Sequence, residues 1–314
     1  MNQAILIMMH KNPEQVVRLV KYFPDDRCVC FIHVDKKCRI DLDEFQAALD
    51  TANGKCIILR ERISGQLANW SLAKISLILI KNAYQYSWEN GIIFSYYRLL
   101  SGQDYPIRTF EEYESFLEKS YPKEYMGINH YEENIMHIQD KFKRWRFNEI
   151  RDKLNWYIKN DRLYKTVIIP IHVLEVLYTK VKGTPYEMMC REGYIVAGGP
   201  SWWSISDRLA AYIVEQIEKE NPLIGIVKNT ATPEESIIQV LYANAPWYKK
   251  EQTYNLTIGN YGKGEQKITG HTYAWRKEDL PDLLESDCFF ARKFDVNIDS
   301  GILDRLDEII YKEN

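Results

Sequence analysis

The sequence lacks an excess of charge of either sign. Its 41 Lys and Arg residues nearly balance its 44 Asp and Glu residues, so the formal net charge is −3 and no overall basicity points to a nucleic-acid partner. Long hydrophobic runs are also missing. The N-terminal run covers only residues 4–9, and the longest later run, residues 167–178, is interrupted by Pro170, His172 and Glu175. Neither is long enough for a signal peptide or a membrane span, so we expect a cytoplasmic protein.

Patterns typical of metal and dinucleotide sites are absent as well. The cysteines show no paired zinc-ligand spacing, and Cys28 and Cys30 stand too close together in an expected strand to form the usual zinc pair. No Gly-x-Gly-x-x-Gly follows an expected strand, which argues against a nucleotide-sugar oxidoreductase. We interpret all six cysteines as reduced and mostly buried thiols: Cys28, Cys30, Cys38, Cys56, Cys190 and Cys288.

What the sequence does contain is an alternation of strands and helices. Apolar runs predict strands, and 3.6-residue periodicity predicts helices. The order of these elements predicts an α/β fold with a mostly parallel central sheet flanked by helices. No linker, repeat or low-complexity tract appears, so we expect a single domain. The expected strands are residues 3–9, 28–34, 56–59 and 92–100, and the expected helices include 14–22, 41–48, 68–85 and 110–119.

The segment 96–107, YYRLLSGQDYPI, is a candidate ligand site. An apolar run ends there in a polar glycine turn, and the following Tyr-Pro is expected to stop regular structure. Ligands of open α/β sheets bind just beyond the carboxyl ends of the strands, so Ser101, Gly102 and Asp104 lie where a substrate is expected. The alternative is an ordinary glycine turn that closes a core strand.

Two further motifs carry charged residues in notable surroundings. The stretch TPEES at residues 232–236 is typical of a helix start, with Thr232 as the N-cap and Glu235 placed to close a capping box. In the run FFARKFD near the C-terminus, Arg292 and Lys293 stand among aromatic residues. Cations in such a setting need an anionic partner, either a phosphate or a carboxylate.

Residues 141–165 are basic and rich in Trp and Tyr. Nine basic residues stand there against three acidic ones, Glu149, Asp152 and Asp161. One interpretation is a solvated helix face. The other is a patch that meets anionic groups, either lipid headgroups at the inner face of a membrane or the phosphate of a lipid-linked substrate.

Four of these motifs, taken in order, resemble the core-2/I-branching glycosyltransferases, a family that includes β-1,6-N-acetylglucosaminyltransferases and peptide O-xylosyltransferases. The stretches 5–11, 31–37 and Asn69-Trp70-Ser71 agree, and the resemblance covers about residues 3 to 308. Mammalian members carry an anchor, a stem and disulfides, so this chain looks like a bacterial, cytoplasmic relative. The four motifs are RLLSGQDYPI at 98–107, GGPSWWSIS at 198–206, TPEESIIQ at 232–239 and FARKFD at 290–295.

The resemblance implies a GT-A type fold with a nucleotide-binding half over about residues 1–107 and an acceptor half over about 108–314. It implies inverting transfer from a UDP-sugar, without a divalent metal, to a glycan or lipid-linked glycan acceptor. We expect GlcNAc transfer to a hydroxyl, O6 of the acceptor, in bacterial surface polysaccharide synthesis. A UDP-xylose-dependent enzyme and a non-catalytic sugar- or nucleotide-binding relative are the alternatives. Asp41-Leu-Asp43 is literally an Asp-x-Asp, but it opens an expected helix, so we interpret it as a cap.

The family's catalytic base matches Glu235, with Glu234 as the neighbour that a one-residue slip would substitute. Its diphosphate-binding lysine matches Lys293, which Arg292 could assist, although a carboxylate partner is favoured for Arg292. A second diphosphate-binding arginine of the family has no counterpart near Gly270 and His271. The candidate substitutes are His271, Arg276 and Lys267.

Nucleoside and sugar contacts are also implied by the resemblance. Asp35 matches the acid that contacts the nucleoside, with turn capping as its alternative, and Met8 and His10 lie in the loop that would wall the base. Three tryptophans would flank the sugar pockets, although one of the adjacent pair is expected in the core: Trp70, Trp202 and Trp203. The acceptor region contains Glu132, Glu133, Lys141, Arg144 and Arg146, which the local match is too poor to assign individually.

Overall fold

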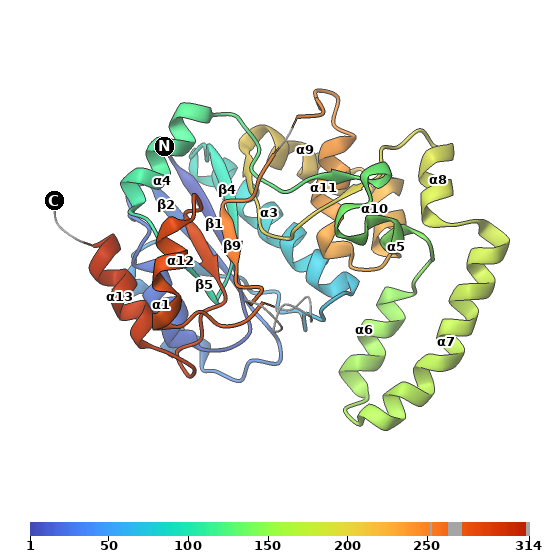
Figure 1. The fold of residues 1–314 in the computed structure, drawn as a ribbon, viewed down its shortest axis with the longest axis horizontal. Helices are drawn as coiled ribbons and strands as arrows, with labels where there is room; N and C mark the ends of the chain where they lie inside the picture. Colours follow the sequence, from blue (N-terminus) through green and yellow to red (C-terminus); the bar gives the residue numbers. More distant parts are fainter. Residues whose placement is uncertain (252, 263–271, 312–314) are drawn as a thin grey trace.

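A five-stranded sheet forms the centre of the molecule (Figure 1). The computed structural model describes residues 1–251, 253–262 and 272–311, except for the side chain of Met136. The strand order is β3-β2-β1-β4-β8, and the first four strands run parallel while β8 is antiparallel to β4. The mostly parallel α/β sheet predicted from the sequence is therefore confirmed. The strands are β1 (Gln3–Met9), β2 (Cys28–Val34), β3 (Cys56–Ile58), β4 (Tyr96–Ser101) and β8 (Ser204–Ser206).

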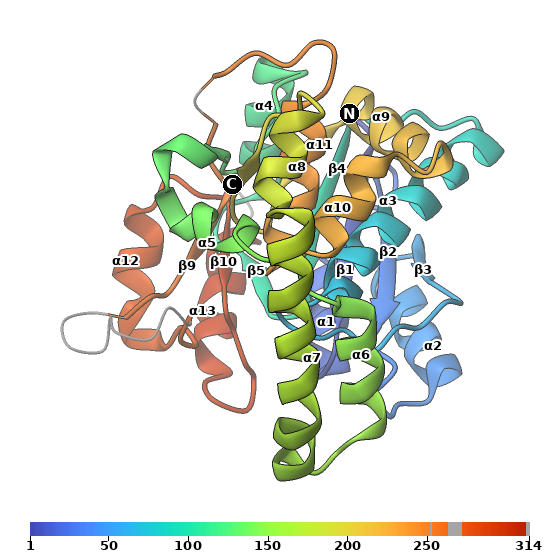
Figure 2. The ribbon, with the colours of Figure 1, turned by 90° about the vertical axis from the view of Figure 1, so that its right-hand side faces the viewer.

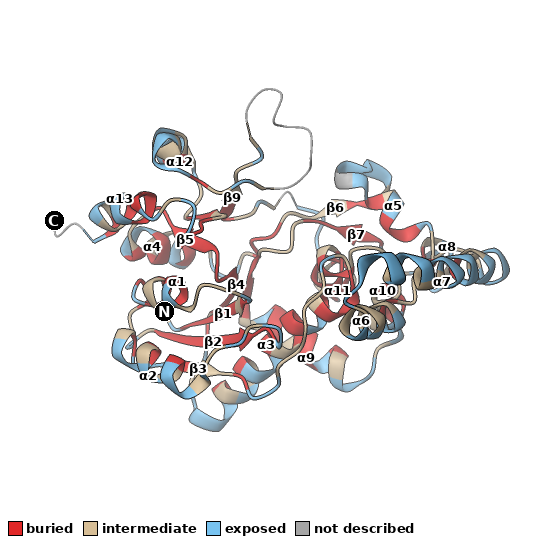
Figure 3. Ribbon diagram, turned by 90° about the horizontal axis from the view of Figure 1, so that it is seen from below, coloured by how far each residue is buried: buried red, intermediate tan, exposed pale blue. Residues whose placement is uncertain are grey.

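Alternate side chains of each strand enter two separate hydrophobic cores. In β1, Ala4 and Leu6 belong to one core cluster and Ile5 and Ile7 to the other, as expected when successive side chains point to opposite faces. The first core lies against α3 (Trp70–Asn90), α9 (Asp207–Glu218) and α11 (Ile237–Ala243). The second lies against α1 (Pro13–Val20), α2 (Leu42–Ala52), α4 (Phe110–Ser120) and α13 (Gly301–Ile310). In Figure 3 the strands are buried and the outer helix faces are exposed.

The strand expected at residues 92–100 is shorter than predicted. Gly91 ends α3 with a positive φ of 64°, and the chain reaches the sheet only at Tyr96. Ile93 is 75% exposed in the connection. The apolar run therefore includes a loop residue, which local hydrophobicity does not distinguish from a strand residue.

A second, three-stranded sheet joins distant parts of the chain. Its order is β5-β10-β9, with β10 (Phe290–Arg292) antiparallel to β5 (Asp104–Pro106) and parallel to β9 (Thr257–Gly259). Tyr105 and Pro106 are the last residues of β5, so regular structure stops at Tyr-Pro as predicted, and Pro106 is tolerated in this edge strand because its missing N–H faces no partner among the described residues. The pairing places Arg292 opposite Asp104.

The remaining helices lie mainly beside the α3 face of the sheet. Figure 2 shows α6 and α7 side by side, with α8 continuing from α7. Within the described ranges no helix is long and apolar enough to cross a membrane. All six cysteines are free thiols: Cys28, Cys30 and Cys56 are buried, Cys38 and Cys288 partly so, and Cys190 is exposed. The other elements are α5 (Ile138–Phe142), α6 (Asn148–Tyr157), α7 (Asp161–Lys182), α8 (Pro185–Arg191), α10 (Pro222–Lys228), α12 (Leu280–Glu285), β6 (Asn129–His130) and β7 (Ala197–Gly198).

Candidate active site

The turn after β4 is buried and satisfies its own hydrogen bonds. The Ser101 N–H and hydroxyl donate to the two oxygens of Asp104 at 2.9 and 2.7 Å. Gly102 packs so closely that a Cβ there would lie 2.8 Å from Cγ2 of Val16. Ser101 and Asp104 therefore brace the end of the strand, as the glycine-turn interpretation expects, and their contact with a substrate stays a prediction.

Asp104 also holds Arg292. The Arg292 Nε donates to Asp104 Oδ1 at 3.2 Å, and its guanidinium lies 4.0 Å from the centre of the Trp202 ring. The carboxylate partner favoured for Arg292 is confirmed. Trp203 is 1% exposed and belongs to the core, whereas Trp202 is only partly buried, so the expectation that one tryptophan of the pair is core is confirmed.

Lys293 lies in a cluster of positive groups at the carboxyl edge of the sheet. Partial burial, then the charges of Arg292 and Lys11, lower the pKa of its ammonium group. Burial, Lys11 and Lys293 likewise lower the pKa of His10. Lys11 pairs with Asp295 at 2.6 Å, but Lys293 forms no ion pair with any residue that the structure describes. This arrangement suits an anionic ligand.

Asp35 closes the turn after β2. Its Oδ1 accepts the Lys37 N–H at 2.7 Å, and its Oδ2 accepts the Gly65 N–H at 2.8 Å. The turn-capping role is confirmed, and nucleoside contact stays a prediction. Met8 pairs in register with Ser101, so the ends of β1, β2 and β4 meet at one edge.

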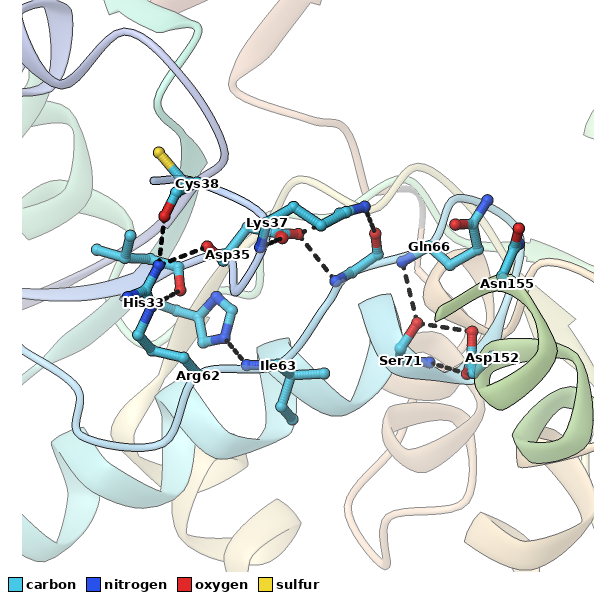
Figure 4. A network of polar contacts seen from close by, with 12 residues as sticks. His33, Asp35, Lys37, Cys38, Arg62, Ile63, Gln66, Ser71, Asp152 and Asn155 are labelled. Carbon is cyan, nitrogen blue, oxygen red and sulfur yellow. Dashed lines mark hydrogen bonds and ion pairs between the residues drawn. The ribbon is translucent and has the colours of Figure 1, made fainter. Parts of the chain in front are cut away.

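A loop between β3 and α3 is pinned to this edge (Figure 4). Arg62 donates to the carbonyl oxygens of Val34, Asp35 and Cys38. The Ile63 N–H donates to Nε2 of His33 at 2.9 Å. At the other end of the loop, Ser71 binds both oxygens of Asp152 from α6. Trp70, beside Ser71, is 9% exposed and packs in the core, and its predicted sugar contact stays untested.

The same loop reaches the TPEES motif. The Ala68 N–H donates to Oε1 of Glu234 at 2.7 Å, and Oε2 of this buried side chain has no hydrogen-bond partner in the described chain. Burial raises the pKa of Glu234 to about 7. The helix start predicted at Thr232 is wrong: Thr232 has a positive φ of 46° and caps nothing, residues Pro233–Glu235 form a 3₁₀ turn, and α11 begins at Ile237.

Glu235 makes an ion pair instead of a capping box. Its Oε2 lies 2.6 Å from Nζ of Lys141 in α5. The Glu235 side chain is 34% exposed and that of Lys141 8%. Lys141 lies in the acceptor region. Local sequence does not predict its pairing with Glu235, because the two residues are 94 residues apart.

Several basic residues of segment 141–165 are occupied by partners inside the fold. Arg151 binds Glu175 through two nitrogens at 2.7 and 2.6 Å, and Arg144 hydrogen-bonds His172 at 2.8 Å. Neither the solvated-face nor the anion-patch interpretation holds for Arg151, which is paired with a buried carboxylate. Of the acceptor-region acids, Glu133 accepts the His130 N–H and pairs with Lys250 at 3.0 Å.

The second phosphate-binding cation is not identified. Lys267 and His271 lie outside the described residues, and Arg276 is exposed. Asp41 caps α2 by accepting the N–H groups of Asp43 and Glu44, as interpreted. In the part of the chain that the structure describes, no three His, Cys, Asp or Glu side chains are grouped so that they could hold a metal ion.

Comparison with known proteins identifies similar sequences. The model of the Core-2/I-Branching enzyme family matches residues 4–280. Xylosyltransferase 2 of Rattus norvegicus is 22% identical over 98% of this chain and 33% of its own length. Xylosyltransferase oxt of Drosophila melanogaster is 23% identical over 95% of this chain and 32% of its own. The chain thus spans about a third of the length of these relatives. A crystal structure of S. aureus TarS matches with a TM-score of 0.28 and 11% identity over 40% of this chain and 21% of that one. This similarity is too low to support a structural conclusion.

Proposed function

The chain belongs to the core-2/I-branching enzyme family, and we propose that it is an inverting glycosyltransferase that moves GlcNAc from UDP-GlcNAc to O6 of a glycan acceptor in bacterial surface polysaccharide synthesis. The observation that carries the proposal is Lys293. Its half-buried ammonium group has no ion-pair partner among the described residues, beside Lys11 and Arg292 and at the edge where sheet ligands bind.

Glu235 is the proposed general base. An inverting transfer requires one group to accept the proton of the acceptor hydroxyl as that hydroxyl attacks the anomeric carbon. Glu235 is partly exposed and ion-paired, whereas Glu234 is buried and tied to Ala68. The exposed carboxylate can reach a substrate without rearrangement of the backbone, which supports Glu235 over its neighbour.

Lys141 is the proposed partner that orients the base. Its ammonium group binds the oxygen Oε2 of Glu235 and leaves Oε1 without a recorded partner in the described structure. That oxygen is available to a hydroxyl donor.

The leaving diphosphate is proposed to be stabilised by protein cations rather than a divalent metal. Lys293 would contact the phosphate oxygens as charge develops on them. Arg292 is restrained by Asp104 and Trp202, so its role is to fix the strand that carries Lys293. Asp35 would bind the nucleoside through lone pairs that its two backbone hydrogen bonds leave free.

A second donor is favoured by one observation. The relatives reported above are named xylosyltransferases, so UDP-xylose is the competing donor. Binding and turnover of UDP-GlcNAc and UDP-xylose, measured by calorimetry and UDP release with and without EDTA, decide between them. Turnover that survives EDTA and is lost in Glu235→Gln supports the proposal. Turnover that EDTA abolishes and manganese restores overturns the metal-free scheme, and binding without hydrolysis or transfer supports a non-catalytic relative.

A further inference from the structure

Helix α7 carries an apolar face that no described part of the chain covers. The large apolar side chains that α7 exposes to solvent are between 40% and 82% exposed. At 3.6 residues per turn, Leu163, Pro170, Leu174, Leu177 and Val181 fall within an arc of about 60°. Away from this arc, Glu175 is buried and binds Arg151, and it is the only buried residue of this helix. Figures 2 and 3 show α7 along the outside of the molecule with its outer surface exposed. The exposed apolar residues include Leu163, Val173, Leu174, Leu177, Tyr178 and Val181.

The α6–α7 hairpin that carries this apolar face is basic. Six exposed cations of the α6–α7 hairpin form no ion pair with any described residue. The hairpin's acidic groups are mostly engaged: Glu149 pairs with Lys228, Asp152 binds Ser71, and Glu175 binds Arg151. Among the acidic residues of the hairpin, only Asp161 is left to balance the charge of these six cations. The six cations are Lys153, Lys159, Arg162, Lys165, Lys180 and Lys182.

This combination selects among occupants of the face. A second copy of the chain would bring six cations against six, which opposes association. A bilayer of anionic lipids supplies an apolar layer for the apolar face of α7 and negative headgroups for the cations. Tyr157, 78% exposed at the end of α6, and Tyr178 have the amphipathic rings that favour the membrane–water interface.

We propose that the outer face of α7 binds an anionic lipid surface, with the apolar face at the headgroup boundary and the cations that flank it on the helix, Arg162, Lys180 and Lys182, at the headgroups. The membrane contact expected for residues 141–165 thereby moves toward the C-terminus, because Lys141 and Arg151 are paired with carboxylates within the fold. The Arg151–Glu175 pair joins α6 to α7. This proposal does not depend on the transfer chemistry.

The test is flotation of the full chain with vesicles of phosphatidylglycerol and phosphatidylcholine, compared with phosphatidylcholine alone. We expect binding to the anionic vesicles that weakens with added salt. The variant Leu174→Glu/Leu177→Glu should bind about tenfold more weakly or worse, because buried apolar area and headgroup attraction are both lost. The matched control, Trp88→Glu/Ile93→Glu, changes two residues that are 73% and 75% exposed outside α7 and should bind like the wild type.

Charge reversal separates the electrostatic part. Lys180→Glu/Lys182→Glu should weaken anionic-vesicle binding about tenfold or more. The control Lys21→Glu/Lys119→Glu should not, because Lys21 directly follows α1 and Lys119 lies in α4, and both helices are at the far side of the sheet (Figure 1). Circular dichroism melting verifies that each variant folds. Equal binding by all variants overturns the proposal. So does a wild-type dimer, measured by sedimentation, that Leu174→Glu/Leu177→Glu converts to monomer, because the face would then join two copies.

Discussion

Asp35 and Glu234 hold the same loop from opposite sides. The Gly65 N–H donates to Asp35 at 2.8 Å, and three residues later the Ala68 N–H donates to Glu234 at 2.7 Å. Asp35 directly follows β2, at the proposed nucleoside site, and Glu234 precedes the proposed base. The loop thus connects two sites that are far apart in the sequence, and its backbone is fixed by carboxylates at both.

The buried carboxyl of Glu234 predicts a pH-dependent stability. Its pKa is raised to about 7 by burial, so the native state holds a proton that the unfolded state releases near pH 4.5. Stability is then fully retained below the unfolded pKa and falls as pH rises through 7, by about 3 kcal/mol at most. Urea unfolding of wild type and Glu234→Gln between pH 5 and 8 should show a smaller decline in the variant.

A second buried carboxyl must be controlled in that experiment. Burial also raises the pKa of Glu124 to about 7. The ionisation of Glu124 therefore also lowers the stability of the native state as the pH rises. Glu124→Gln should remove its own part of the slope and leave that of Glu234. Parallel slopes for wild type and Glu234→Gln would contradict the assignment.

Replacing the proposed base should separate catalysis from folding. Glu235→Gln keeps the shape of the side chain, and its partly exposed position leaves the core unchanged. We expect a normal melting temperature and a kcat lowered by about a hundredfold to ten thousandfold, because general-base catalysis contributes about that much. The measurement is UDP release. Full activity in a folded Glu235→Gln variant would place the base elsewhere, with Glu234 the next candidate.

Adjacent cations should have separable roles. Lys293→Met should weaken UDP-sugar binding about tenfold to a hundredfold, because a charge-assisted contact is lost, with little change in melting temperature. Arg292→Met should lower stability by about 1–3 kcal/mol, because Asp104 is fully buried and loses its cation. Calorimetric titration and thermal melting measure the two effects. Unchanged donor affinity in Lys293→Met would remove the cation on which the proposal rests.

The pH dependence of donor binding gives an independent check on Lys293. Because its pKa is lowered by burial and by Arg292 and Lys11, the ammonium group loses its proton earlier on the alkaline side than an exposed lysine does. The affinity of the wild type for UDP should therefore fall as the pH rises toward the usual pKa of a lysine side chain. Lys293→Met should lack this decline.

The sequence predicted what depends on short-range pattern. The four parallel strands, the cap at Asp41 and the carboxylate partner of Arg292 each follow from neighbouring residues or from a single burial argument. The prediction failed at Thr232, where a favourable cap sequence adopts a positive φ. Tertiary contacts decide the conformation there, since Ala68, from another loop, takes up the adjacent carboxylate.

The Lys141–Glu235 pair and the outward face of α7 were beyond local reasoning for a related physical reason. The former joins residues far apart in the chain. The latter depends on which side of a 22-residue helix meets the protein. The sequence of α7 has apolar residues on more than one side of the helix, so the pattern alone does not show which side faces outward. Only the packing of Glu175 against Arg151 identifies the inner side.

That packing supplies the last prediction. Glu175 is fully buried, and Arg151 satisfies it through two hydrogen bonds with help from the Phe147 N–H. Although burial opposes ionisation, these contacts lower the pKa of Glu175, so the pair stabilises the fold above the unfolded pKa, and this contribution is lost as pH falls. Arg151→Met should therefore reduce stability by about 3–5 kcal/mol at neutral pH, because the carboxylate is left buried without a cation.

The matched control for this pair is Arg162→Met, which removes an exposed cation of the same hairpin and should change stability little. The double variant Arg151→Met/Glu175→Leu should recover much of the loss, since it replaces the ion pair with apolar groups. Urea unfolding at pH 7 measures all three. A loss in Arg151→Met no larger than that in Arg162→Met would mean that α7 is held to α6 by its other contacts rather than by this pair.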